Sequence, residues 1–444
     1  MPALGFTWEE FKARRSRLCE RLGKKGLVLL QGAPGPKGSS TFEQYNDFFY
    51  LSGLEVPHAY LLLDAKTEKT TAYLPQRAQL DIQSNEEPFC AENAERVCKE
   101  TGLDAVRSIA MLGGPLSQAT LVHTPMEDGQ PRAVNRHHSR SLVGELAADP
   151  WDTRLTRSAQ FIDNLRRQFP RIEVRDLSKH LDEMRLVKSP AEVAMLRRAG
   201  KLCAQGVVEA MRATEPGVIE YQLDAVMRYH YLAGGATDKG YHAIVASGPN
   251  IYHGHYSANN RKMENDDWVL VDCAPDYRHY TSDIGRMWPV NGTYSPWQRA
   301  LYGFVVEYHK ALLAAIRPGR MKEEIHAQVA EQMAERLKTW PFATDSQREG
   351  ARRMLEFKGH ISHSVGMSVH DGSGHYSRPL QEGMVFSVDP QCWIQEEKVY
   401  VRCEDTIAIT ADGIENLTSA APLELDETEA MVRRKGMLQA FPAV

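Results

Sequence analysis

The spacing of apolar and polar residues in the first part of the chain predicts helices and short strands in turn. Phe11, Leu18 and Leu22 share one face of a helix that should begin after Thr7, where Thr7-Trp8-Glu9-Glu10 has the form of a capping box. The runs GLVLLQG, YLLLDA and TTAYLPQ then indicate short strands separated by turn residues. The polar stretch Asn135–Arg157 is expected to be surface structure. This part of the chain therefore predicts an α/β domain.

A sharper helix start occurs further along, where Ser189-Pro190-Ala191-Glu192 combines an N-cap Ser, a Pro at the first helical position and a Glu at the third. Apolar residues at helical spacing follow as far as Pro216-Gly217. The domain boundary should lie just before this helix, which gives domains of residues 1–177 and 178–444. From Asp266 onward the pattern is strand-rich, with one helical block from about Pro296 to Lys338, so the second domain is expected to be α+β.

The segment WVLVDCAPDYRHYTSDIGRMW has two apolar runs around a polar turn, which predicts a hairpin. If the turn centres between Tyr277 and Arg278, Asp272 and Asp283 lie directly opposite each other and point to the same face. Two carboxylates whose Cβ atoms are about 5 Å apart repel each other. A bound cation would compensate for that repulsion.

The same geometry recurs in MVFSVDPQCWIQEEKVYVRCEDTIAIT, where a turn between Glu396 and Glu397 places Asp389 opposite Glu404. Pro390 cannot donate a ladder hydrogen bond and is expected to disturb this register. Between the two hairpins lies GHISHSVGMSVHDGSGH, which contains four histidines: His360, His363, His370 and His375. One imidazole with four carboxylates is a plausible ligand set for two divalent transition metals, and not all four histidines can be ligands.

Composition and charge narrow the class of protein. A chain of 444 residues favours two domains or more. The 53 basic and 58 acidic residues leave a net charge of -5, which provides no basic field for nucleic acid. Charged residues interrupt the N-terminal segment, and we find no apolar run long enough for a membrane span. A cytoplasmic protein is therefore expected, and seven cysteines without CxxC pairs indicate free thiols.

These segments together resemble the aminopeptidase P and prolidase family of pita-bread metallopeptidases. The resemblance rests on HYSANNRKMENDDWVLVDCAPDYRHYTSDIGRMWPVNG, SHSVGMSVHD, GMVFSVDP and VRCEDTIAITADGIENLT, and it extends upstream through RLVKSPAEVAMLRRAG. QYNDFFYLSGL is similar to a segment of the family's N-terminal domain, which methionine aminopeptidases lack. The resemblance implies an α/β N-terminal domain followed by an α+β pita-bread catalytic domain.

The resemblance also implies a role for individual residues. It places Asp272, Asp283, His363, Asp389 and Glu404 at five metal-ligand positions, and this retained set argues against the metal-free chemistry of creatinase. The two cations are expected to be manganese, with zinc or cobalt as alternatives, bridged by Asp283 and Glu404. A bridging water would be the nucleophile, and Asp389 would take its proton. The remaining catalytic positions are His255, His370 and Arg402.

The implied activity is hydrolysis of the bond between an N-terminal residue and proline, on a peptide substrate. The alternatives are a Xaa-Pro dipeptidase and a pita-bread pseudoenzyme that binds peptides without turnover. By analogy with the family, a homodimer or homotetramer is expected. The chain departs from the family pattern at two positions. The family has Glu where this chain has Asp389. The family also has a histidine upstream of the SHSVGMSVHD segment at the position of Gly359, whereas the nearest histidine of this chain, His360, is one position later.

Overall fold

The computed structural model describes residues 5–35, 41–80, 87–131, 134–359, 361–372 and 377–441. The chain separates into two compact units, residues 1–185 and residues 186–444. The boundary predicted at 177/178 lies at the start of helix α7 (Ser178–Leu186), and the units divide at the last turn of that helix.

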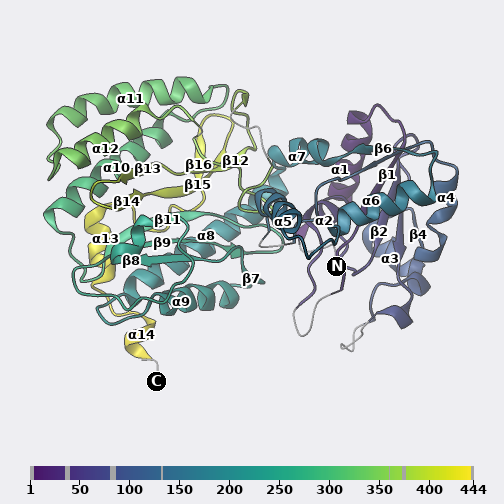
Figure 1. The fold of residues 1–444 in the computed structure, drawn as a ribbon, viewed down its shortest axis with the longest axis horizontal. Coiled ribbons are helices and arrows are strands. Elements are labelled where there is room, and N and C mark those ends of the chain that lie inside the picture. The colour runs from purple at the N-terminus through teal and green to yellow at the C-terminus, as the bar shows by residue number, and fades with distance from the viewer. Residues whose placement is uncertain are drawn as a thin grey trace. The chain divides into compact units, whose positions relative to one another are not determined.

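The first unit is an α/β domain built on one six-stranded mixed sheet (Figure 1). The strand order is β4-β3-β2-β1-β5-β6, in which the β1–β2 and β2–β3 pairs are antiparallel and the others parallel. Its strands are β1 (Leu27–Gln31), β2 (Tyr60–Asp64), β3 (Thr70–Leu74), β4 (Ala105–Ser108), β5 (Leu121–Thr124) and β6 (Glu173–Asp176). Its helices before α7 are α1 (Trp8–Arg21), α2 (Asn46–Ser52), α3 (Ala94–Thr101), α4 (Gly113–Ser117), α5 (Arg136–Ala148) and α6 (Arg157–Gln168).

The three strands and the opening helix of this unit agree with the sequence pattern. Thr7 is the N-cap residue of α1, but its side chain makes no capping hydrogen bond, so the predicted capping box is wrong. Helix α5 occupies most of the stretch that was expected only to be surface structure. Leu142 and Val143 on this helix are 47% and 48% exposed, which explains why no buried apolar stripe marks it in the sequence.

The second unit is α+β, with a six-stranded antiparallel sheet of order β12-β15-β11-β9-β8 and β16 beside β15. No described helix is long and apolar enough to cross a bilayer. The strands of the unit are β7 (Asp238–Lys239), β8 (Ile244–Ser247), β9 (Trp268–Cys273), β10 (Pro275–Asp276), β11 (Ile284–Pro289), β12 (Val385–Val388), β13 (Gln391–Ile394), β14 (Val399–Arg402), β15 (Glu404–Ile409) and β16 (Ile414–Asn416). The helices are α8 (Pro190–Ala213), α9 (Glu220–Ala233), α10 (Pro296–Ala315), α11 (Lys322–Thr339), α12 (Asp345–Glu356), α13 (Leu425–Val432) and α14 (Met437–Ala440).

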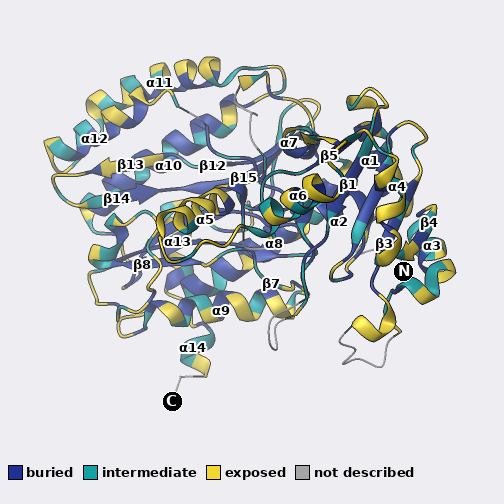
Figure 2. Cartoon of the chain, turned by 45° about the vertical axis from the view of Figure 1, so that its right-hand side comes forward, coloured by how far each residue is buried: buried dark blue, intermediate teal, exposed yellow. Residues whose placement is uncertain are grey.

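The central strand β9 is buried on both faces. Trp268 and Leu270 belong to the hydrophobic cluster formed with α10, α11 and α12, whereas Val269 and Val271 belong to the cluster formed with α8 and α9. Figure 2 shows the strands buried between helices whose outer faces are exposed. Side chains alternate along a strand, so Asp272 lies on the same face as Trp268 and Leu270. The sheet therefore places a carboxylate inside an otherwise apolar core.

The helix predicted at Ser189 is confirmed. The Ser189 hydroxyl accepts from the Glu192 amide at 3.3 Å, and the Glu192 carboxylate accepts from the Ser189 amide at 3.0 Å. The single block predicted from Pro296 to Lys338 is two helices, α10 and α11, and α12 follows them. Gly319 lies in the turn between α10 and α11, and its positive φ of 84° is a backbone conformation that favours glycine.

The predicted register of the first hairpin is wrong by two residues. Asp272 pairs with Gly285, not with Asp283. The turn centres between Arg278 and His279, whose φ angles of 55° and 68° are those of a tight left-handed turn. Moving the turn centre by one residue shifts the pairing by two, so Asp272 and Asp283 keep the same face as diagonal neighbours.

The register of the second hairpin is confirmed. Gln391 pairs with Arg402 in the β13–β14 ladder, and Val388 pairs with Asp405 in the β12–β15 ladder. Both ladders follow one register, which puts Asp389 opposite Glu404. The ladder is interrupted between Val388 and Gln391, where Pro390 has no amide hydrogen to donate.

Candidate metal centre

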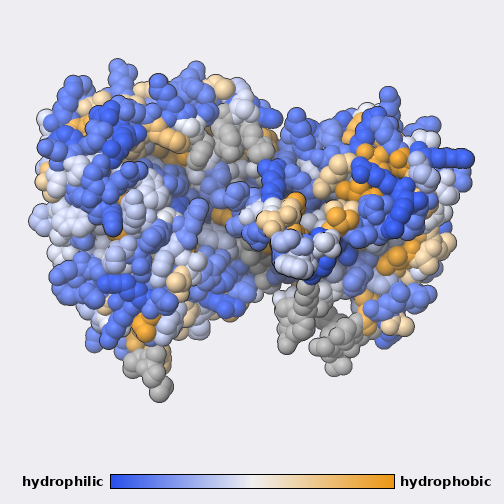
Figure 3. Space-filling model, viewed as in Figure 1, coloured by the Kyte–Doolittle hydropathy of each residue, from blue (hydrophilic) through white to orange (hydrophobic). Residues whose placement is uncertain are grey.

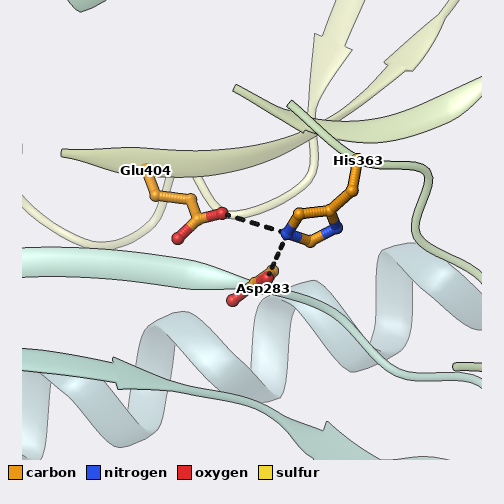
Figure 4. A group of neighbouring side chains, drawn as sticks. All are labelled: Asp283, His363 and Glu404. Carbon is orange, nitrogen blue, oxygen red and sulfur yellow. Dashed lines mark ion pairs between the residues drawn. The ribbon is translucent and has the colours of Figure 1, made fainter. Parts of the chain in front are cut away.

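Three metal-ligand side chains meet in the second unit. Ligand atoms of Asp283, His363 and Glu404 all lie within 4.8 Å of one another. The His363 Nε2 atom lies 3.3 Å from the Asp283 Oδ2 atom and 3.8 Å from the Glu404 Oε1 atom. Figure 4 shows the imidazole pointing between the two carboxylates: Asp283 directly precedes β11, and Glu404 is the first residue of the neighbouring strand β15.

Arg402 connects the remaining two carboxylates, Asp272 and Asp389, to Glu404 of this group. Its guanidinium donates to Asp272 at 2.5 Å and to both oxygens of Asp389, at 3.1 Å and 2.9 Å, and it also pairs with Glu404. The structure therefore brings together all five side chains that the sequence predicts as metal ligands. We call these five the acidic cluster: Asp272, Asp283, His363, Asp389 and Glu404.

Gly285 makes room for this arrangement. It pairs with Asp272 on one side and with Glu404 on the other. A Cβ atom at this position would lie 3.0 Å from the Glu404 Cβ and 3.3 Å from the Arg402 Nε. A side chain there would press on both groups, so a glycine at the second position of β11 is the residue that lets them meet.

The carboxylates are strongly buried, at 6% exposure for Asp272, 3% for Asp283 and 0% for Glu404. Burial and the neighbouring Asp272 carboxylate raise the pKa of Asp283 well above its usual value, although Arg402 opposes the shift. Burial likewise raises the pKa of Glu404, with contributions from Asp283 and Asp389 against Arg402. The negative charges are thus packed more densely than one guanidinium relieves.

The cluster fits divalent cations. The Glu404 Oε1 atom, which faces the His363 Nε2 atom, is buried and has no hydrogen-bond partner among the described residues. An unsatisfied buried carboxylate oxygen is costly, and a cation is the species that crowded carboxylates and an imidazole would satisfy together. Oxygen and imidazole nitrogen ligands suit divalent transition metals.

The histidine segment is held against the sheet at the free edge of β12. The Ser387 amide donates to the His363 carbonyl at 3.0 Å, and the Val365 amide donates to the Val385 carbonyl at 3.0 Å. The Ser387 hydroxyl also lies 3.2 Å from the His363 Nε2 atom. These contacts fix the position from which the His363 imidazole reaches the cluster.

A buried ion pair closes the same segment. The Lys188 ammonium lies 3.4 Å from an Asp371 oxygen and donates to the Ser364 hydroxyl at 3.1 Å, and both charged side chains are 1% exposed. The Asp371 amide donates to the Ser364 carbonyl at 2.8 Å. A Cβ atom at Gly366 would lie 2.0 Å from the Asp371 carboxylate, so only glycine allows this close approach.

The other predicted histidines have different positions. The His370 ring lies 4.1 Å from the His363 ring, centroid to centroid, which places it beside the cluster. His255 is exposed on the loop after η5 (Gly248–Tyr252), and within the described ranges no hydrogen bond or ion pair joins it to the cluster. His360 and His375 lie outside the described residues.

The sequence prediction missed Tyr241. Its hydroxyl oxygen lies 2.6 Å from Asp272 and 2.5 Å from Asp283, so it can donate its single hydrogen to either carboxylate and links the two acids that the hairpin leaves on a diagonal. Burial and these two carboxylates raise the pKa of Tyr241. Tyr241 lies 31 residues before Asp272 and follows no periodic pattern, so only the folded arrangement reveals it.

Comparison with known proteins places these features in a family. Residues 194–411 match the model of metallopeptidase family M24, and residues 11–121 match the N-terminal domain of aminopeptidase P. The Xaa-Pro aminopeptidase of Escherichia coli K12 is 30% identical over 445 residues, covering 96% of this chain and 97% of that protein.

Two solved structures show the same fold. Zinc-substituted E. coli aminopeptidase P in complex with product superimposes with a TM-score of 0.76 at 26% identity, covering 96% of this chain and 98% of that one. A structure described as a putative aminopeptidase P from Bacillus anthracis gives a TM-score of 0.79 at 22% identity, covering 98% and 100% of the two chains. The chain belongs to the aminopeptidase P family of M24 metallopeptidases, with an α/β N-terminal domain, a pita-bread catalytic domain and the chemistry of a metalloaminopeptidase.

Proposed function

We propose that this enzyme releases the first residue of peptides whose second residue is proline. The proposal rests on the close approach of the Asp283, His363 and Glu404 side chains, whose ligand atoms lie within 4.8 Å of one another. Arg402 connects Glu404 to the two remaining acids, Asp272 and Asp389. The name of the E. coli relative, a Xaa-Pro aminopeptidase, supports the choice of substrate. The test compares Xaa-Pro-Yaa tripeptides with Xaa-Pro dipeptides: faster cleavage of the tripeptides is expected, whereas cleavage of dipeptides alone would indicate a dipeptidase.

The acidic cluster is the proposed site of two divalent cations, with manganese as the preferred metal. When bound, they would polarise the scissile carbonyl and acidify a water molecule. Asp283 and Glu404, the two carboxylates that face the His363 imidazole, are the proposed bridging residues. Arg402 is the proposed positioning residue, since it holds Asp272, Asp389 and Glu404 in one arrangement through charge-assisted hydrogen bonds.

The remaining roles belong to proton transfer and charge stabilisation. Asp389 is the proposed proton acceptor because it faces the cluster from the interrupted ladder. His370, which packs on His363, is the proposed donor toward the negative charge that develops on the substrate carbonyl. His255 shares that role if substrate binding brings its loop over the cluster. A bond to proline has no amide hydrogen, so the site does not need an acceptor for one.

His370→Ala is expected to lower turnover about 100-fold while the protein keeps its metal, because the residue packs on a ligand but is not one. Metal analysis beside steady-state kinetics gives both quantities. His253→Ala is a matched control, since His253 is another exposed histidine of the same loop as His255. His255→Ala should lower turnover and His253→Ala should not. Loss of metal from His370→Ala would reassign His370 as a ligand.

Asp389→Glu is expected to tighten the weaker metal site about tenfold and to raise turnover. Asp is one methylene shorter than Glu, a difference of about 1.5 Å in reach. Both Asp389 oxygens already accept from Arg402, and Asp389, like Asp272, is not part of the described group of Asp283, His363 and Glu404 whose ligand atoms lie within 4.8 Å of one another. Metal titration of both variants, with peptide cleavage, measures the change. Tight binding of two metals by the natural protein, with activity lost in Asp389→Glu, would show that the shorter acid is part of the working site.

We also propose a homo-oligomer in the cytoplasm. Hydrophobic side chains are exposed on the first unit, and Figure 3 shows such residues on its visible face. Among the described residues of this unit, the exposed hydrophobic side chains include Leu142, Val143, Trp151 and Leu155, of which Trp151 is 93% exposed. Exposed apolar patches favour association, which sedimentation can measure. All seven cysteines are free, which suits a reducing compartment.

A further inference from the structure

A cavity of about 500 Å³ lies beside the acidic cluster, between helices α10, α11 and α12 and strand β13. Most of its wall is apolar or aromatic, including Tyr308, Leu312, Met354, Phe357, Ile361 and Trp393, and its polar residues are His326, Arg353, Asp389, Gln391 and Gln395. This volume falls within the range of small-molecule sites, about 300–1,000 Å³.

The cavity shares a residue with the candidate metal centre. Asp389 lies in its wall and also accepts from Arg402, which binds Asp272 and Glu404. Gln391, a second wall residue, donates to Asp389. A group that occupies the cavity therefore lies against Asp389, which is itself a member of the acidic cluster.

The other side of the cavity adjoins the loop that carries His255. Trp393 packs on Tyr400 with ring centroids 4.2 Å apart and contacts Tyr252 edge to face at 5.7 Å. A Cβ atom at Gly254 would lie 3.3 Å from the Trp393 ring, so the loop backbone lies directly against it. The cavity thus lies between Asp389 and the His255 loop, the two elements proposed to act on the substrate.

We propose that this cavity binds a large apolar side chain on the first residue of the substrate. The inference rests on the proposed function, because that side chain is attached next to the scissile carbonyl and must lie beside the cluster when the carbonyl is there. A proline ring of three methylenes would fill only a small part of the space. A phenylalanine, leucine or methionine side chain would gain the burial that the apolar wall offers.

The natural enzyme is expected to cleave Phe-Pro-Ala with a kcat/KM at least about tenfold above that of Ala-Pro-Ala. Met354→Trp fills the cavity from α12 and should reduce this ratio to near one, mainly by loss of activity on the Phe peptide. Phe357→Ala widens the rim at a side chain that is 49% exposed, and should lower the ratio about threefold without endangering the fold. Arg352→Trp adds the same ring to the exposed face of α12 and should leave both activities unchanged.

A binding measurement keeps the inference separate from the proposed function. L-phenylalaninamide and L-alaninamide are titrated separately into the natural protein, and binding is measured by calorimetry. The aromatic compound should bind at least about tenfold more tightly, and Met354→Trp should abolish this difference. If the metal-loaded enzyme releases neither first residue, the proposed function fails, and this titration still decides the cavity. Equal binding of the two amides, or a folded Met354→Trp protein with an unchanged preference, would overturn the assignment.

Discussion

Asp283→Asn should lower kcat/KM on Xaa-Pro-Yaa peptides by about 1,000-fold or more and should strip the protein of metal. Asp283 is 3% exposed, lies 3.3 Å from His363 and shares Tyr241 with Asp272, so it contacts one predicted ligand directly and a second one through Tyr241. Replacement by an amide removes the charge that would hold a cation. The cations are expected to supply several kcal/mol of transition-state stabilisation, which corresponds to about three powers of ten.

The matched control is Asp412→Asn, the same change at an exposed aspartate that follows β15. It should change neither metal content nor activity. Metal analysis and kinetics on the same samples separate the two effects. An Asp283→Asn protein that keeps two metals and most of its activity would remove Asp283 from the ligand set, and the bridging role with it.

Lys188→Met should lower the free energy of unfolding of the second unit by about 3–5 kcal/mol, the usual cost of removing one partner from a buried ion pair. Lys188 and Asp371 are both 1% exposed, and Asp371 closes the segment that positions His363. The change would leave a buried carboxylate without this cation. Urea unfolding followed by tryptophan fluorescence reports on the second unit, which holds most of the tryptophans: Trp268, Trp288, Trp297, Trp340 and Trp393.

The double variant Lys188→Met/Asp371→Asn tests whether the buried Asp371 charge, left without Lys188, causes the loss of stability. It leaves no charge of the pair behind, so it should regain part of the lost stability. A Lys310→Met control removes a lysine from exposed pairs with Glu307 and Glu424 and should cost at most about 1 kcal/mol. If Lys188→Met is as mild as Lys310→Met, the ion pair does not hold the histidine segment.

Most of the cluster could be predicted from the sequence because strand periodicity reports faces reliably. Asp272 and Asp283 were placed on one face although their pairing was wrong by two residues. An error of one residue in the turn centre moves the pairing by an even number, so the face is preserved. The left-handed Arg278–His279 turn gave no glycine or asparagine signal, which explains the error.

The second hairpin was predicted better because its apolar alternation continues through both ladders. Gln391 pairs with Arg402 and Val388 with Asp405, as the sequence indicated. Pro390 interrupted the hydrogen bonds but did not change the register, since a missing donor removes a bond without adding a residue.

Other parts of the site depend on contacts between distant segments, which periodicity cannot report. Tyr241 reaches Asp283 across 42 positions, and Lys188 reaches Ser364 across 176. Helix α5 was not predicted because its apolar residues Leu142 and Val143 are exposed and form no buried stripe.

The proposed two-metal aminopeptidase activity is tested most directly by titrating manganese into metal-free protein. Bound metal and release of the first residue from a Phe-Pro-Ala peptide are measured in the same samples. Release should be absent without metal, should rise as the sites fill and should be greatest at two cations per chain. Fully occupied protein that releases nothing, or release at the same rate by the metal-free protein, would contradict the assignment of a two-metal Xaa-Pro aminopeptidase.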